Sequence, residues 1–161
     1  MVTFRPIKAT DEKQLIKVYS ETIFTEFPEY SVNIRRYFIN KRYRQEMFDL
    51  PTKLGAFLDN DMIGYLIAHG PHGGIAYIYW LAILPKYQNQ GLGTKFLTFF
   101  ENWCKKKGVH VIQLQSDRRN LEFYKKRGYS VLGFDEKGYF GVDNYIMKKV
   151  IQEPKEKNFL K

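Results

Sequence analysis

The 161-residue sequence predicts an α/β fold, in which a mixed sheet (α+β in its strand order) carries helices on both faces. Two observations predict it. In some segments apolar residues alternate or run on without interruption, and in others they recur every three or four positions. These strand-like and helix-like segments follow one another as strand, two helices, three strands, helix, strand, helix and two strands. The hydrophobic content of 44% is enough to fill the core of one ordinary domain.

The N-terminal third is expected to form one strand and two helices. Residues 2–6 read as a short strand, and Thr10 or Asp11 can cap the helix that follows. A second helix is expected to begin near Ser31. The segment 35–44 mixes cations with aromatic residues, as nucleic-acid-binding surfaces do. Its apolar spacing also fits an amphipathic helix with the aromatic residues inside, and we favour this second interpretation.

The middle of the chain is expected to form an antiparallel meander of three strands. Residues 53–58 and 62–69 read as a hairpin around a polar turn. Residues 70–74 have the glycine and proline content of a second turn. The most apolar run, 75–84, is too short and too rich in Ile, Tyr and Trp for a helix, so it predicts a fully buried central strand.

The C-terminal half is expected to alternate helices and strands. A helix with a broad apolar face opens at Gly91, and Gly108 suits its end, where a positive φ is common. The elements after it are a strand over 109–114, a short helix over 120–127, and strands over 130–134 and 144–150. We therefore expect one domain over residues 1–151 and a loose, charged tail over 152–161.

Composition limits the classes of function and of site. The net charge of +9 favours an anionic partner without identifying it. No apolar run is long enough to span a bilayer, and the N-terminus lacks the apolar core of a signal peptide. Because Cys104 is the single cysteine, no intrachain disulfide can form, and we expect a cytoplasmic protein. His69 and His72 lie in turn-like sequence, so we also expect no metal.

The junction after the central strand carries the chemistry. There the segment Gln88-Asn-Gln-Gly-Leu-Gly93 leads directly into a helix. Amide groups at a helix start lack internal partners and lie at the positive end of the helix dipole, so they can bind a diphosphate. Gly91 and Gly93 allow the backbone to approach that group closely. The side chains of Gln88 and Asn89 can add further donors.

The same segment matches the pattern Gln/Arg-x-x-Gly-x-Gly/Ala, whereas its continuation, Thr94-Lys95-Phe96, fits neither a Walker loop nor a dinucleotide-binding loop. A strand-like segment, Tyr79-Trp-Leu-Ala-Ile-Leu-Pro85, precedes it. A second signature, Leu121-Glu-Phe-Tyr-Lys-Lys-Arg-Gly-Tyr129, follows at a matching spacing. On these features the sequence resembles the GNAT superfamily of N-acetyltransferases over about residues 60–150. The resemblance implies a three-layer fold with about six to seven strands, and acetyl-CoA as co-substrate.

The resemblance also implies a role for each motif residue. Tyr124 matches the tyrosine that donates a proton to the departing CoA thiolate. The family often has Asn seven residues before this tyrosine, where this chain has Asp117, and Asn120 is an alternative source of that amide contact. The main-chain groups that would pair with the pantetheine arm belong to Leu81, Ala82 and Ile83. The amides that would hold the pyrophosphate belong to Gln88, Asn89, Gln90, Gly91, Leu92, Gly93 and Thr94.

Acidic and aromatic residues cluster in the loop between the first two helices, the region that borders the acceptor in relatives. There Glu26 and Glu29, with the neighbouring aromatic rings, would suit a cationic amine by charge and by cation–π attraction. The alternative is a solvated acidic loop whose aromatic residues belong to the core. We expect direct acetyl transfer from acetyl-CoA to a primary amine, on a small molecule or on a protein.

Two other functions are consistent with parts of the sequence. One is a non-catalytic acyl-CoA-binding sensor that uses the same pocket. The other is a basic nucleic-acid-binding protein, which leaves the glycine-rich junction unexplained and therefore ranks last. We expect no membrane partner, and a homodimer is compatible with the family resemblance.

Overall fold

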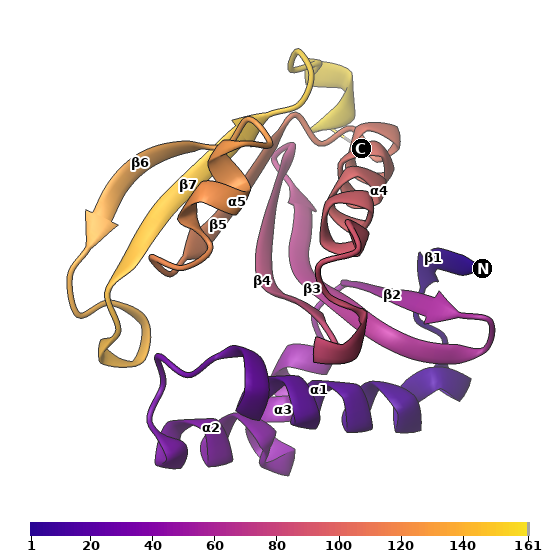
Figure 1. The fold of residues 1–161 in the computed structure, drawn as a ribbon. Coiled ribbons are helices and arrows are strands. Elements are labelled where there is room, and N and C mark those ends of the chain that lie inside the picture. The colour runs from indigo at the N-terminus through magenta and orange to yellow at the C-terminus, as the bar shows by residue number, and fades with distance from the viewer. Residues whose placement is uncertain (161) are drawn as a thin grey trace. The chain divides into compact units, whose positions relative to one another are not determined.

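The computed structural model describes residues 1–160, and its strands form a seven-stranded sheet in the order β1-β2-β3-β4-β5-β7-β6 (Figure 1). β4 and β5 pair in parallel, whereas β1 with β2, β2 with β3, β5 with β7 and β6 with β7 pair antiparallel. This mixed sheet with its helices confirms the predicted fold class. The strands are β1 (Val2–Pro6), β2 (Thr52–Leu58), β3 (Asp61–His72), β4 (Ile75–Ile83), β5 (Val111–Ser116), β6 (Ser130–Asp135) and β7 (Asn144–Val150).

Five α-helices and four short 3₁₀ turns connect these strands in the described part of the chain. The helices are α1 (Glu12–Glu26), α2 (Val32–Ile39), α3 (Lys41–Phe48), α4 (Leu92–Lys106) and α5 (Leu121–Lys125). The 3₁₀ turns are η1 (Ala9–Asp11), η2 (Pro85–Tyr87), η3 (Tyr139–Gly141) and η4 (Glu156–Asn158). The chain divides into two compact units. The first contains Met1–Ala68 and Trp80–Phe99, and the second contains His69–Tyr79 and the chain from Phe100 onward.

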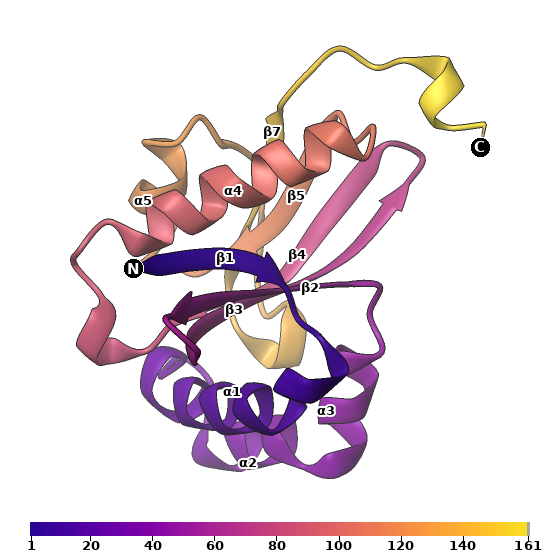
Figure 2. The same ribbon diagram turned by 90° about the vertical axis from the view of Figure 1, so that its right-hand side faces the viewer.

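In the first unit, helices cover both faces of β1, β2 and β3 (Figure 2). The helices α1, α2 and α3 lie on one face, where the ring of the buried Tyr19 in α1 is 5.5 Å from the ring of Tyr65 in β3. The start of α4 lies on the other face, where Phe96 stacks on Phe4 of β1 with the ring centroids 5.0 Å apart. Burial of these rings on both sides supplies the core of the unit.

The segment after Ser31 forms two helices rather than one. Ser31 caps α2 as expected, because its Oγ accepts a hydrogen bond from the Ile34 amide at 3.3 Å. Asn40 then interrupts the helix with an extended backbone, and its Oδ1 accepts from the Tyr43 amide at 2.9 Å to cap α3. Apolar periodicity runs across this break, and only the capping ability of asparagine marks it.

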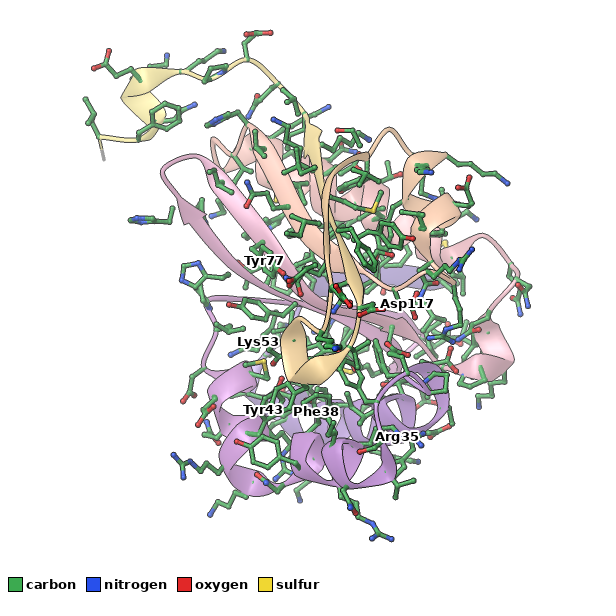
Figure 3. The ribbon with its side chains drawn as sticks, turned by 90° about the vertical axis from the view of Figure 1, so that its left-hand side faces the viewer. Arg35, Phe38, Tyr43, Lys53, Tyr77 and Asp117 are labelled. Carbon is green, nitrogen blue, oxygen red and sulfur yellow. The ribbon has the colours of Figure 1, made fainter. Side chains whose placement is uncertain are left out.

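The structure confirms the amphipathic interpretation of residues 35–44 for Phe38 and Tyr43, whereas Tyr37 is 40% exposed. Phe38 and Tyr43 are 0% and 3% exposed, and their ring centroids lie 4.8 Å apart. Figure 3 labels both residues among the helices of the first unit. Arg35 is held as well, because its Nη1 donates to the Phe24 carbonyl at 2.8 Å. The rings of Phe38 and Tyr43 therefore belong to the core and cannot stack on bases.

In the second unit, α4 is tied to the sheet by a partly buried polar network. Glu101 accepts a hydrogen bond from the Tyr129 hydroxyl at 3.2 Å and pairs with Nζ of Lys149 in β7 at 2.8 Å. Cys104, one turn further along α4, is a free and fully buried thiol. Burial, with a smaller contribution from the charge of Glu101, raises the pKa of this thiol far above its ordinary value.

Several strand boundaries differ from the expected ones, most clearly the end of β3 and the start of β5. β3 continues to His72, so the turn before β4 is confined to Gly73 and Gly74, whose φ angles are 57° and 76°. β5 begins at Val111 rather than at residue 109. The Val109 amide instead donates to the Cys104 carbonyl at 3.0 Å, so this residue closes the end of α4.

The tail after β7 was expected to be loose, but its described residues are held by hydrogen bonds and ring contacts. The side chain of Gln152 donates to the carbonyls of Val109 and Lys105 at 2.6 and 3.1 Å. The ring of Phe159 lies 5.2 Å from that of His110. Charge content therefore did not indicate how firmly this segment docks on the second unit.

Candidate functional site

The end of β4 offers a stretch of main chain next to the glycine-rich junction. The parallel register with β5 covers Ile75–Ile78 on the β4 side, so Leu81, Ala82 and Ile83 lie beyond its last pair. On the β3 side, Gly64 approaches β4 so closely that a Cβ there would lie 2.7 Å from the Ala82 carbonyl oxygen. Glycine is required at this crossing because any side chain would push the end of β4 away.

The junction itself is a sharp turn followed by an open helix start. Asn89 and Gly91 have φ angles of 58° and 72°, and α4 begins at the next residue, Leu92. The Gly91 carbonyl accepts a hydrogen bond from the Lys95 amide at 3.0 Å, which makes Gly91 the capping residue. A Cβ built on Gly91 would meet no atom within 4 Å, so the space above it is open.

This helix start has the properties that an anion needs. The amides of Leu92 and Gly93, in the first turn of an α-helix, have no carbonyl partner within the helix. The helix dipole places positive potential there. Within the described helix α4, the first turn carries no acidic side chain that would oppose a bound anion. A diphosphate group fits this donor set, and the open space above Gly91 can admit it.

The side-chain amide of Gln88 donates its hydrogen bonds within the protein rather than to a bound phosphate. Its Nε2 donates to Oε2 of Glu26 at 2.6 Å and to the Ile83 carbonyl at 2.8 Å. The structure therefore brings together three residues that the sequence placed in separate parts of the site. The contact with Glu26 joins positions 62 residues apart, and no local sequence pattern could have indicated it.

In the second unit, Tyr124 lies on α5 with its ring packed edge-on against Phe123 and Tyr129, at centroid distances of 5.1 and 5.6 Å. Among residues 1–160 its hydroxyl has no hydrogen-bond partner. Burial, and to a lesser degree the negative charge of Asp117, raises the pKa of Tyr124 well above its ordinary value. The hydroxyl is therefore protonated throughout the neutral range and is free to donate.

Asp117 is committed to the start of α5. Its carboxylate accepts from the Asn120 amide at 2.8 Å and from Arg119 at 2.6 and 3.0 Å, and its side chain is 9% exposed. Figure 3 labels this side chain. Asn120 is exposed, and within the described chain its side-chain amide makes no hydrogen bond. Of the two, Asn120 is thus the residue with an amide still available to a ligand.

The two acidic candidates sit at the end of α1. Glu26 is the last residue of this helix and Glu29 follows in the loop, and both are half-buried. The expected aromatic wall is partly core, since Tyr30 is buried and the half-buried Phe27 packs edge-on at 4.8 Å from Trp80. Phe24 is the partly exposed ring of the group. Charge, more than aromatic surface, is what this loop presents.

Other kinds of site find little support in the described chain. No group of three or more His, Cys, Asp or Glu within residues 1–160 is arranged to hold a metal ion. No helix in that range is both long and apolar enough to cross a bilayer. A hollow of about 290 Å³ in the first unit contains none of the predicted site residues. It is lined by Ile7, Lys8, Ala9, Glu12, Leu15, Gln45, Phe48, Asp49 and Lys53.

Comparison with known proteins agrees with this geometry. A model of the acetyltransferase (GNAT) family matches residues 15–129. S-alkylcysteine N-acetyltransferase of Bacillus subtilis (strain 168) is 33% identical over 88 residues, covering 50% of this chain and 48% of that protein. The match thus spans about half the length of this curated relative.

Solved structures resemble most of the chain. PaiA N-acetyltransferase from Thermoplasma acidophilum, in complex with coenzyme A, has a TM-score of 0.79 and 26% identity, covering 93% of this chain and 99% of that one. The ribosomal-protein-S18-alanine N-acetyltransferase from Escherichia coli has a TM-score of 0.73 and 21% identity, covering 97% of each chain, and supports the fold.

Proposed function

Because the chain belongs to the acetyltransferase (GNAT) family, we propose that it transfers an acetyl group from acetyl-CoA directly to a primary amine. The observation that carries this proposal is the junction of β4 and α4. There Gly91, with a φ of 72°, turns the backbone into the start of α4, and a Cβ built on it would meet no atom within 4 Å. A diphosphate, which CoA carries and most amine substrates lack, is the group that such a helix start binds best.

In this proposal the main chain supplies most of the contacts with CoA. The amides from Asn89 to Gly93 hold the pyrophosphate, and the backbone of Leu81, Ala82 and Ile83 pairs with the pantetheine arm. The Gln88 amide, which the sequence placed in this set, already donates to the Pro85 carbonyl at 3.1 Å. The end of the β4–β5 register at Ile78 supports this pairing, because the three residues lie past it. Asn120, with its exposed amide, takes the remaining contact in place of Asp117.

The proposed chemistry moves two protons. The acceptor amine gives one proton to a carboxylate, Glu26 or Glu29, and its nitrogen bonds to the thioester carbon. As the carbon–sulfur bond breaks, the sulfur takes the second proton from the Tyr124 hydroxyl. The raised pKa of Tyr124 supports a hydroxyl that is always protonated when it is needed. It also makes the phenol a weaker acid than the CoA thiol, so the tyrosinate left after the transfer must regain its proton from solvent before the next turnover.

The relatives suggest which amines to test. One acts on S-alkylcysteines and one on the alanine of a ribosomal protein, so both a small molecule and a protein N-terminus have a precedent. A suitable panel is S-methyl-L-cysteine, a peptide that begins with alanine, spermidine and an aminoglycoside. The first two present α-amino groups, and the last two present amines on cationic molecules.

Two measurements test the proposal. Calorimetry with acetyl-CoA and CoA measures cofactor binding, and mass spectrometry of the panel after incubation measures acetylation. Binding together with acetylation supports the enzyme. Binding without acetylation of any panel amine favours the non-catalytic sensor, and absence of binding refutes both.

A further inference from the structure

Both N–H donors of the Gln88 side chain are engaged within the first unit. Nε2 lies 2.6 Å from Oε2 of Glu26 and 2.8 Å from the carbonyl oxygen of Ile83. A glutamine amide carries two N–H groups on one nitrogen, so these contacts use both. The atom that is left, Oε1, accepts hydrogen bonds and would repel a phosphate oxygen. In this geometry the side chain does not supply the phosphate donor that the sequence predicted.

We propose that Gln88 acts instead on the acceptor side, as a positioning residue that holds the Glu26 carboxylate where it takes the proton of the acceptor amine. This inference rests on the proposed function and deepens it by choosing Glu26 over Glu29. A neutral amide suits the task, because it fixes one carboxylate oxygen and leaves the negative charge in place. An arginine or lysine in the same contact would neutralise that charge.

The position of Glu26 is hard to explain by stability. It is the last residue of α1, and the helix dipole makes the C-terminal end unfavourable for a negative charge. Its charge also reaches the hydroxyl of the buried Tyr65, whose pKa is raised mainly by burial and in part by Glu26. Gln88 therefore holds a carboxylate at a place that helix formation alone does not favour.

Glu26 is also held firmly from both sides along the chain. One turn earlier, Oγ1 of Thr22 lies 3.0 Å from the Tyr65 hydroxyl oxygen. At the next residue, the ring of Phe27 packs 4.8 Å from that of Trp80 in β4. With these anchors, the hydrogen bond from Gln88 contributes to the orientation of the carboxylate.

The hydrogen bond from Gln88 to the Ile83 carbonyl connects Glu26 to β4. Ile83 is the last residue of β4, and its backbone belongs to the stretch proposed to pair with pantetheine. One side chain therefore links the proposed proton acceptor to the strand that would carry the acetyl donor. Such a link fixes the distance between the two reacting groups, which is the main requirement for direct transfer.

The first test separates this role from phosphate binding. Calorimetry with CoA compares Gln88→Leu with the wild type and with Gln45→Leu, a matched control. Gln45 also donates to a carboxylate, Oδ1 of Asp49 at 2.7 Å, but outside the site. We expect both variants to keep their CoA affinity within about twofold. A loss of about tenfold or more in Gln88→Leu alone would identify a phosphate ligand and overturn the inference.

The second test is a double-mutant cycle on turnover, with each panel amine that the wild type acetylates. Loss of a hydrogen bond to a charged group predicts a fall of about 10- to 100-fold in kcat/KM for Gln88→Leu. The fall should lie mainly in kcat, with KM for acetyl-CoA unchanged. If Gln88 acts through Glu26, adding Gln88→Leu to Glu26→Gln lowers kcat/KM no further.

The outcomes distinguish this inference from the proposed function. Additive effects in the cycle, or unchanged turnover in Gln88→Leu, would refute the positioning role while the acetyltransferase stands. A wild type that binds CoA but acetylates none of the four amines would refute the transfer reaction and the role of Glu26 with it. A thermal unfolding midpoint for Gln88→Leu close to that of Gln45→Leu shows that any loss of turnover is not a loss of fold.

Discussion

Arg5 donates two hydrogen bonds to the carboxylate of Asp11, from Nη1 to Oδ2 at 2.7 Å and from Nη2 to Oδ1 at 3.0 Å. The Lys8 amide also donates to Oδ2, at 2.8 Å. The guanidinium contact, opposed by burial and assisted by this amide, lowers the pKa of Asp11 to about 2. The pair fixes the strand β1 to the turn that begins α1.

Because of the Arg5–Asp11 pair, we expect the free energy of unfolding to fall at acid pH. Because the pKa of Asp11 is lower in the folded chain than in the unfolded one, its contribution is complete above about pH 4 and is lost as the pH falls toward 2. We expect Asp11→Asn to lower the free energy of unfolding by about 2 kcal/mol at pH 7, and by about half as much at pH 3. Urea unfolding at the two pH values measures this. Asp59→Asn, at a carboxylate that is 80% exposed, should change stability little at either pH.

Gly91→Ala tests the proposed diphosphate site. The positive φ of 72° costs an alanine about 1 kcal/mol, and its methyl group would enter the open space where the phosphates are proposed to lie. Gly73→Ala is the control, with a φ of 57° and equally open surroundings. We expect similar losses of stability in both variants, but at least about a tenfold loss of CoA affinity only in Gly91→Ala. Equal CoA affinities would place the phosphates elsewhere.

Tyr124→Phe tests the proton donor. Removal of a general acid predicts a fall in kcat of about 100-fold or more, with the dissociation constant for CoA nearly unchanged. Because the pKa of Tyr124 is raised, no loss of turnover from its ionisation is expected below about pH 10. Tyr145→Phe, on β7 in the same unit, should keep wild-type turnover. Full turnover in Tyr124→Phe with every accepted amine would remove this residue from the mechanism.

Glu101 tests the network of the second unit. Glu101→Leu leaves Lys149, whose side chain is 24% exposed, without its partner and removes the acceptor of the Tyr129 hydroxyl. We expect a loss of about 3 kcal/mol in the free energy of unfolding. The double variant Glu101→Leu/Lys149→Met should recover part of this loss, because the unpaired ammonium is then gone. A double variant less stable than Glu101→Leu would contradict this explanation.

The parts of the fold that local chemistry determines could be predicted from the sequence. The run from Ile75 to Ile83 is apolar enough to be a buried strand, and the glycines at 91 and 93 mark the helix start. The break at Asn40 could not be placed, because asparagine is tolerated in a helix and also caps one. The docking of the tail through Gln152 depends on carbonyls of Lys105 and Val109, which no pattern near Gln152 reveals.

The candidate site divides in the same way. The cofactor side relies on backbone amides and glycine, which leave a local motif. The acceptor side relies on side chains that meet across the fold, as Gln88 and Glu26 do. The local sequence predicts that Gln88 donates to a phosphate, because Gln88 precedes the glycine-rich helix start. The contact with Glu26 depends on the fold and leaves no trace in the residues next to Gln88.

Because Cys104 is buried, chemical labelling of its thiol can be used to measure unfolding of the protein. The chain contains one cysteine, its side chain is 0% exposed, and its pKa is raised, so a thiol-reactive dye added to the native protein should find nothing to label. Every molecule that opens α4 exposes a single equivalent of thiol. The labelling rate in the absence of denaturant then measures how often this helix leaves the core.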